Sequence, residues 1–174
     1  MGYTHYWDIS KDVKEISKEC LKDIKKVLQK HKGIIQFESD NTKKPIVNKK
    51  EIRFNGIGGD GYETFNVLMP DALKKEGKRC DEGLYFNFCK TAKQPYDVVV
   101  CEVLLLLKAD LKDKIKVSSD GFSHDSCSFD GSWDKAIYEI TNMKYHVNCC
   151  CQSRAVSPYY DCEIIEVVRV KGDD

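Results

Sequence analysis

Apolar side chains recur at steps of three and four residues near the start of the chain, which predicts an amphipathic helix over residues 10–32. The apolar stripe consists of Val13, Ile16, Cys20, Ile24 and Val27. Ser10 is a suitable N-cap, and Gly33 follows the last apolar turn, where a left-handed residue often ends a helix. Carboxylates interrupt the lysines on the opposite side, so we interpret that side as a solvated surface rather than a phosphate-binding one.

Aromatic, β-branched and alternating segments predict strands in much of the remaining chain. We expect them at residues 3–8, 33–38, 51–55, 62–68, 84–88, 114–118 and 163–170. Pro95 opens a second predicted helix over residues 96–111, in which apolar residues occupy nearly every side. A third, shorter helix is expected near Ser132. Because strands and helices do not alternate regularly, the sequence predicts an α+β fold with a mainly antiparallel sheet. Two or three helices pack this sheet, and one of them is central and largely buried.

The length and charge of the chain limit its class. We expect one domain over residues 1–145, followed by a cysteine-rich C-terminal extension over residues 146–174 that ends in a strand. Lys plus Arg and Asp plus Glu both number 28, so no basic surplus favours duplex nucleic acid as a partner. No apolar stretch approaches the ~20 residues of a membrane span, and the first residues do not resemble a secretory signal. We therefore expect a soluble, cytoplasmic protein that does not bind membranes.

Nine cysteines, an odd number, favour a reducing compartment over a disulfide framework. The run Cys149, Cys150 and Cys151 lies between His146 and Cys162, which suggests a zinc site. Zinc ligands normally follow spacings such as C-x2-C, which the chain lacks, and adjacent cysteines on a strand point to opposite faces. We predict no metal and no cofactor, and zinc binding by this run stays an open alternative.

Residues 56–61 contain the spacing G-x-G-x-x-G after a predicted strand. In a dinucleotide-binding fold these glycines precede a helix whose amino end holds the pyrophosphate. Here the next residues alternate like a strand, so we interpret the segment as a glycine-rich hairpin loop.

The segment between the predicted strand at 84–88 and the second helix is a candidate ligand clamp. Lys90 and Thr91 offer an ammonium and a hydroxyl near the free N–H groups of the following helix, which suits a phosphate or a carboxylate. Asp97, in the first turn of that helix, either contacts a ligand or stabilises the helix terminus.

His5 belongs to the most aromatic segment of the chain. On a strand, Tyr3, His5 and Trp7 share one face. If that face belongs to the core, His5 is a buried, hydrogen-bonded histidine. If it lines a cleft, the aromatic rings form a stacking wall and His5 is a polar contact or an acid–base group.

Several of these segments carry a family resemblance. They are the opening Met-Gly-Tyr-Thr-His-Tyr-Trp, Phe-x-Phe-Cys-Lys-Thr-Ala at 86–92, and Val-Ser-Ser-Asp-Gly at 117–121. In these segments the chain resembles a family of small bacterial and phage proteins without an established activity, over residues 1 to about 145. The resemblance implies a prokaryotic or phage cytosolic protein. It also groups residues that are expected to share a site: His5, Trp7, Asn55, Glu63, Lys90, Tyr96, Asp97, Ser119 and Asp120.

Aromatic, hydroxyl, carboxylate and single-lysine groups near strand ends are typical of a pocket for a small polar or anionic ligand. We therefore expect a binding protein for a nucleotide or a nucleotide-derived signal. By analogy, a phage-encoded binder of this kind sequesters an immune signal of its host. The alternative is a hydrolase of a phosphate- or glycosyl-linked nucleotide that uses His5, Glu63 and Asp120 for acid–base chemistry. A further alternative is a protein-interaction module. The sequence leaves the choice between binding and turnover, and the oligomeric state, open.

Overall fold

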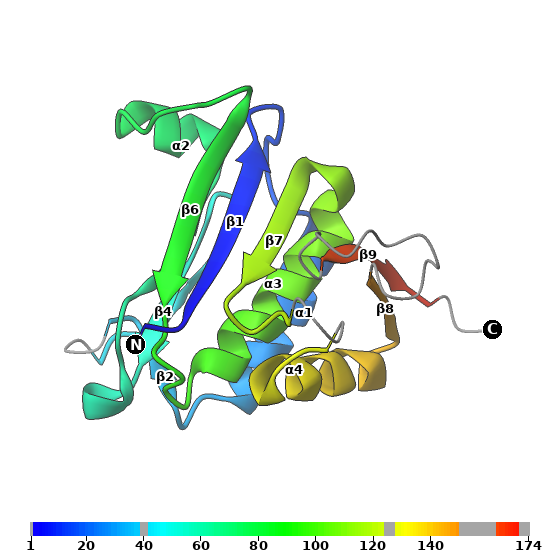
Figure 1. Cartoon of the computed structure of the whole chain (residues 1–174). Helices are drawn as coiled ribbons and strands as arrows, with labels where there is room; N and C mark the ends of the chain where they lie inside the picture. Colours follow the sequence, from blue (N-terminus) through cyan, green and yellow to red (C-terminus); the bar gives the residue numbers. More distant parts are fainter. Residues whose placement is uncertain (1, 39–41, 124–127, 150–162, 171–174) are drawn as a thin grey trace.

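The central sheet places the first strand between two later ones. A computed structural model describes residues 2–38, 42–123, 128–149 and 163–170. Strand β1 (Thr4–Ser10) pairs antiparallel with β6 (Leu84–Lys90) on one side and with β7 (Ile115–Ser119) on the other (Figure 1). Strands β6 and β7 are therefore parallel to each other, and helix α3 (Asp97–Leu111) connects them. Their carboxyl ends lie at the same edge of the sheet.

In the described part of the chain, the three longest helices lie on one face of this sheet (Figure 1). Helix α3 lies against the sheet, and α1 (Lys18–Lys30) and α4 (Gly131–Asn142) pack on α3 from the same side (Figure 1). Every side chain from residue 99 to residue 107 is at most 1% exposed. A fully buried Val or Leu stabilises the fold by about 1.5–3 kcal/mol. The expected α+β class, with one central and buried helix, is thus confirmed.

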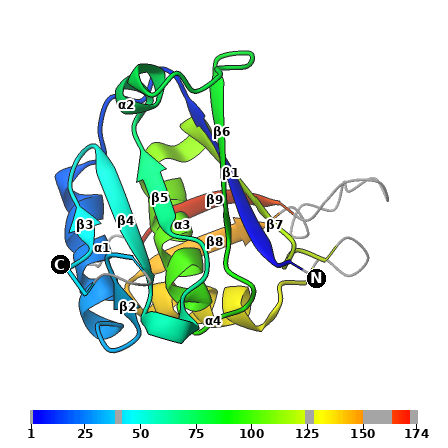
Figure 2. The same cartoon turned by 90° about the vertical axis from the view of Figure 1, so that its left-hand side faces the viewer.

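A second group of strands lies beside β6. Strand β4 (Glu51–Gly56) pairs antiparallel with its three neighbours, β2 (Ile35–Gln36), β3 (Ile46–Val47) and β5 (Phe65–Leu68) (Figure 2). Short helical segments connect the strands. They are η1 (Gly58–Asp60), α2 (Pro70–Lys75) and η2 (Lys112–Lys114).

The last described residues form a hairpin of β8 (Tyr145–Cys149) and β9 (Ile164–Arg169) that packs against α4 and α3. The buried carboxylate of Asp23 ties it to α1, because it accepts hydrogen bonds from the Tyr145 hydroxyl at 2.7 Å and from Arg169 at 2.9 Å. No helix among the described residues is long and apolar enough to cross a membrane.

The first helix begins later than its apolar stripe predicts. Ser17, not Ser10, caps α1 by accepting a hydrogen bond from the Cys20 N–H at 3.1 Å. Ser10 still belongs to β1, where it pairs with Leu84, so it is not available as a cap. Val13 and Ile16 are buried in the extended segment between strand and helix. The helix ends at His31, so the expected role of Gly33 was wrong as well.

The glycine-rich segment is the loop between β4 and β5, as expected, and no helix follows it. The side chain of Asn55 holds this loop closed. Its amide donates to the Tyr62 carbonyl at 3.0 Å, and its oxygen accepts from the Tyr62 N–H at 3.1 Å. Gly56 passes so close to the far side of the loop that a Cβ atom there would lie 2.3 Å from the Asp60 carbonyl oxygen.

Replacement of Gly56 by alanine is expected to destabilise the protein by about 1–3 kcal/mol, the usual cost of overpacking, because backbone and not a flexible side chain must move. Gly59→Ala is the matched control in the same loop, since a Cβ atom at Gly59 meets nothing within 4 Å. Urea unfolding of both variants measures the difference. Equal stabilities would contradict the close approach at Gly56.

Candidate functional site

The carboxyl ends of β6 and β7 meet the amino end of α3 at one edge of the sheet. Because β1 is antiparallel to both strands, it begins at this edge, and His5 pairs with Cys89 on β6 and with Ser119 on β7. Loops that leave such an edge frequently hold ligands. Most of the residues that the sequence singled out gather here.

His5 is fully buried and makes a hydrogen bond through each ring nitrogen. Nε2 lies 2.6 Å from Oδ1 of Asp97, and Nδ1 lies 2.9 Å from Oγ of Ser119. The rings of Tyr3 and Trp133 meet the imidazole edge-on, with centroid distances of 5.3 Å and 5.4 Å. The face of β1 that carries His5 therefore belongs to the core, which is the first of the two interpretations of this residue.

The hydrogen bonds of Ser119 determine the tautomer of His5. Its Oγ accepts from the Gly121 N–H and from the Trp133 indole N–H, both at 3.0 Å. Those two bonds occupy both lone pairs of the hydroxyl, so Ser119 donates its single proton, and Nδ1 of His5 at 2.9 Å is a nearer acceptor than the Thr4 carbonyl at 3.4 Å. Nδ1 is then an acceptor, and Nε2 carries the proton that His5 donates to Asp97. With both lone pairs engaged, Ser119 is not arranged as a nucleophile.

Asp97 anchors the other end of this chain of hydrogen bonds. Its Oδ1 also accepts from the hydroxyl of Thr91, in the turn before α3. Burial raises the pKa of Asp97, but the hydrogen bond from His5 and weaker contributions, including that of Thr91, outweigh burial and hold this pKa below its usual value. The carboxylate is therefore ionised at neutral pH, and it connects β1, the turn and α3.

His5, Asp97 and Cys101 form the one group of potential metal ligands found among the described residues, with ligand atoms within 4.8 Å of one another. Tetrahedral zinc keeps its ligand atoms about 3.3 Å apart, whereas Nε2 and Oδ1 lie at a hydrogen-bond distance of 2.6 Å. Burial raises the pKa of the Cys101 thiol well above its usual value, so the thiol is neutral. Oδ2 of Asp97 is buried and makes no hydrogen bond among the described residues, so it is the one oxygen of this group that could accept a further ligand. The short Nε2–Oδ1 distance and the neutral thiol nevertheless show that the three residues do not fit a metal ion.

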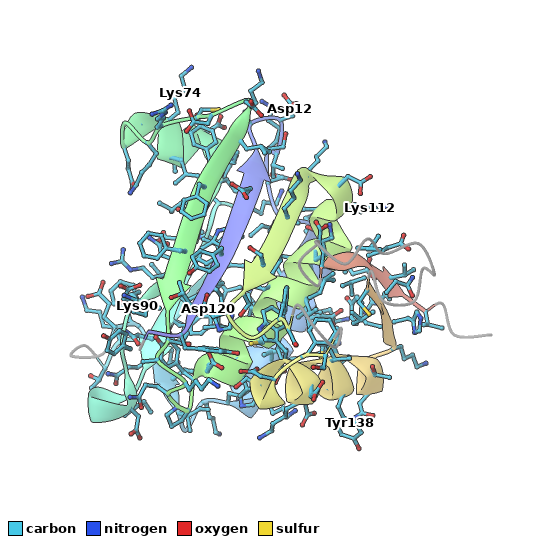
Figure 3. The ribbon with its side chains drawn as sticks, viewed as in Figure 1. Asp12, Lys74, Lys90, Lys112, Asp120 and Tyr138 are labelled. Carbon is cyan, nitrogen blue, oxygen red and sulfur yellow. The ribbon has the colours of Figure 1, made fainter. Side chains whose placement is uncertain are left out.

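Lys90 lies at the end of β6, and its backbone is clamped rather than free. Its N–H donates to Oε2 of Glu63 at 2.7 Å, and its carbonyl accepts from the Glu63 N–H at 3.2 Å. The Tyr96 hydroxyl donates to the Glu63 carbonyl at 2.6 Å, which fixes the same corner from the side of α3. The Lys90 ammonium makes no ion pair among the described residues. Figure 3 shows it at the same end of the sheet as Asp120.

The turn between Lys90 and α3 holds a strained backbone. Ala92 and Lys93 both have left-handed conformations, with φ of 51° and 58°, which cost on the order of 1–3 kcal/mol each in non-glycine residues. The Tyr3 carbonyl accepts from the N–H groups of Thr91 and Ala92 and keeps the turn in place. Such strain is more frequent at binding sites than elsewhere.

Two of the predicted site residues, Trp7 and Asn55, lie apart from the buried cluster, which is the hydrogen-bonded group of His5, Thr91, Asp97 and Ser119. Trp7 is 1% exposed and packs on Phe65, with ring centroids 5.2 Å apart, so it is a core residue. Asn55 holds the loop after β4. Cys150, Cys151 and Cys162 lie outside the described residues, and so does the zinc alternative that depends on them.

The open face of the sheet holds aromatic residues that the sequence reasoning did not single out as a site. Phe86 and Phe88 on β6 are 57% and 53% exposed. Tyr6 stacks with Phe86 at a centroid distance of 6.2 Å, and Phe86 lies 6.1 Å from Phe88. Asp120 orients Tyr6, because its Oδ1 accepts from the Tyr6 hydroxyl at 3.2 Å while Oδ2 accepts from the Thr4 N–H at 2.9 Å. The alternation of Phe86 and Phe88 along the strand was the available signal.

The pairing of β6 with β1 places the side chains of this face in a fixed sequence along the strands. Lys90 lies across from Thr4, Phe88 across from Tyr6, and Phe86 across from Asp8. A cavity of about 530 Å³ adjoins the Asp8 end, and Phe86 and Leu84 form part of its lining. Lys90 and Asp120 therefore lie at one end of the face (Figure 3). Asp8 lies at the other end, with Lys116 across from it and Arg79 in the adjoining cavity, and aromatic rings lie between the two ends.

Replacement of Asp97 by asparagine is expected to destabilise the protein by about 1–3 kcal/mol at pH 7, because the buried imidazole loses its charged partner. The folded pKa of Asp97 lies below its unfolded value, so its contribution is present above about pH 4 and is lost as the pH falls through the folded value. The stability difference between wild type and Asp97→Asn should therefore shrink on acidification. The control is Asp12→Asn, at an exposed carboxylate at the other end of the sheet (Figure 3). Parallel stability–pH curves for wild type and Asp97→Asn would refute this role.

Comparisons with protein-family models, with curated proteins and with solved structures find no match for this chain. The geometry of the described residues therefore carries the functional proposal.

Proposed function

We propose that the protein binds a nucleotide or a nucleotide-derived signal on the open face of β6, β1 and β7, at the edge where Lys90 lies. The observation that carries the proposal is the pair of half-exposed phenylalanines, Phe86 and Phe88, beside an ammonium group without an ion-pair partner among the described residues. Aromatic side chains on a sheet surface stack with bases, and a nearby lysine attracts a phosphate.

The spacing of the groups supports a ligand that lies along the strands. Asp8 lies four residue steps along β1 from Thr4, which is beside Lys90, and four steps correspond to roughly 13 Å at 3.3 Å per residue. That is about the length of an extended mononucleotide. The base stacks on Phe88 and Phe86, the phosphate meets Lys90, and amino or hydroxyl groups of the ligand donate to Asp8.

The buried cluster supports this face instead of taking part in binding. His5, Thr91, Asp97 and Ser119 use their polar groups on one another, and Glu63 and Asp120 fix the ends of β6 and β1. A hydrolase that uses His5, Glu63 and Asp120 would need these groups to reach a substrate. Their hydrogen bonds favour binding without turnover.

Biologically, we propose a cytoplasmic protein from the bacterial and phage family that its opening residues resemble. The free thiols of Cys20, Cys80, Cys89, Cys101 and Cys149 support a reducing compartment. A phage protein that holds a nucleotide without hydrolysing it sequesters a signal of host immunity, which is a role assigned by analogy.

Replacement of Phe88 by alanine is expected to weaken nucleotide binding by about 1–3 kcal/mol, the range for one stacked base, with little change in melting temperature. The control is Tyr138→Ala on α4, another exposed aromatic residue that lies away from the sheet (Figure 3). A thermal-shift screen of mononucleotides, cyclic nucleotides and ADP-ribose-type molecules first identifies the tightest ligand, and calorimetry then compares the variants. No shift with any of these molecules, with the fold intact, would refute the proposed function.

Replacement of Lys90 by alanine should weaken binding of the same ligand by about 1.5–3 kcal/mol, the scale of a hydrogen bond to a charged group. Lys90→Arg should restore only part of the affinity, since a planar guanidinium does not replace a compact ammonium beside Gly2. Lys74→Ala on α2 is the control (Figure 3). Calorimetric titration measures the three variants, and unchanged affinity in Lys90→Ala would remove this residue from the site. Recovery of intact ligand after heat denaturation would show that binding occurs without turnover.

A further inference from the structure

A groove on the helix side of the molecule carries a second set of basic groups. It lies between the carboxyl-terminal half of α1 and the strands β2 and β3, which Figure 2 shows side by side. Its volume is about 670 Å³, within the range of small-molecule sites. Lys25 of α1 and Lys32, in the turn after α1, line one wall, and Lys43 and Lys44, before β3, line the other.

The lysines form two groups in the sequence, Lys25 with Lys32 and Lys43 with Lys44, and the fold brings the two groups to one groove. Lys25 lies in α1, and Lys32 lies in the turn that follows the helix, so the helix end brings both to the same side of the groove. None of the described residues that line the groove is acidic. Converging charges of one sign above a low-dielectric surface concentrate their field in the space between them.

The ion pairs of α1 distinguish the lysines of the groove from their neighbours. Lys26 is paired with Asp23 and Lys30 with Glu139. Lys25 and Lys32 make no ion pair among the described residues. The carboxylate of Glu38, near the end of β2, is itself bound to Arg53, so it does not neutralise the groove.

The floor of the groove is apolar. Leu28 and Ile35 belong to the core and are 7% and 5% exposed, and Val47 of β3 adjoins them. Cationic walls above an aliphatic floor suit a ligand with several negative charges and one flat apolar part. Phosphorylated organic molecules of nucleotide size have this composition.

We propose that this groove is a second binding site, for a small phosphate-bearing ligand whose apolar part lies on Leu28 and Ile35. Its phosphates bind the four lysines, Lys25 and Lys32 on one side and Lys43 and Lys44 on the other. The site does not depend on the nucleotide site of the open face, because it uses different residues on the other side of the sheet.

The test titrates tripolyphosphate and ATP into the wild-type protein by calorimetry. Both should bind, ATP several-fold more tightly because its base contacts the floor, and both should weaken as salt is raised from 50 to 200 mM. The double variant Lys25→Glu/Lys44→Glu removes one cation from each wall and should weaken tripolyphosphate binding at least tenfold. The control Lys74→Glu/Lys75→Glu makes the same change in net charge on α2 and should weaken it less than twofold. The four substituted residues, Lys25, Lys44, Lys74 and Lys75, are all exposed, so both double variants should keep the wild-type melting temperature.

Three results would overturn the proposal. Absence of tripolyphosphate binding at millimolar concentration removes the site, and an equal loss in both double variants shows that net charge alone is responsible. Equal affinities for tripolyphosphate and ATP reject the role of the apolar floor. Phe88→Ala separates the two sites, because it should leave tripolyphosphate binding unchanged whether or not the open face binds nucleotides.

Discussion

A single buried imidazole holds the main elements of this protein together. His5 of β1 donates to Asp97 at the start of α3 and accepts from Ser119 at the end of β7. Ser119 in turn accepts from the indole of Trp133 in α4, and Asp97 accepts from the hydroxyl of Thr91 in the turn after β6. Removing one partner from such a buried, charged arrangement leaves a desolvated group unpaired, which costs several times more than an exposed contact. This network joins β1, the turn after β6, α3, β7 and α4 at the site edge.

The alternation of side chains along the strands gives neighbouring residues different roles. His5 points into the core, while Tyr6, the next residue, lies on the open face. Thr91 is buried against Asp97, while Lys90 reaches the surface, and Ser119 and Asp120 divide in the same way. Each of these pairs therefore contains one residue that belongs to the buried framework and one that lies at the surface of the open face.

Much of the fold could be predicted because its signals are local. The apolar run of α3 and the strand patterns of β1, β4, β6 and β7 identify these elements within a residue or two of their observed ends. The start of α1 could not be predicted, since Ser10 and Ser17 are both competent caps and only the pairing of Ser10 with Leu84 decides between them. The candidate site was predicted in part: the family resemblance implied that His5, Asp97 and Ser119 share a site, but it could not show that their hydrogen bonds are satisfied internally. Phe86 and Phe88 were not recognised as a surface, because their exposure depends on which face of the sheet the helices cover.

The protonation of the His5 ring tests this account most directly. Nitrogen-15 NMR of labelled histidine at pH 7 should show Nε2 protonated and Nδ1 unprotonated, as the two donors to Ser119 require. Addition of saturating nucleotide should leave both ring nitrogens unchanged while the amide signals of residues 86–90 shift. A proton on Nδ1, or ring signals that move with nucleotide as far as those amides do, would contradict the assignment of the buried cluster to the framework and of the open face to the ligand.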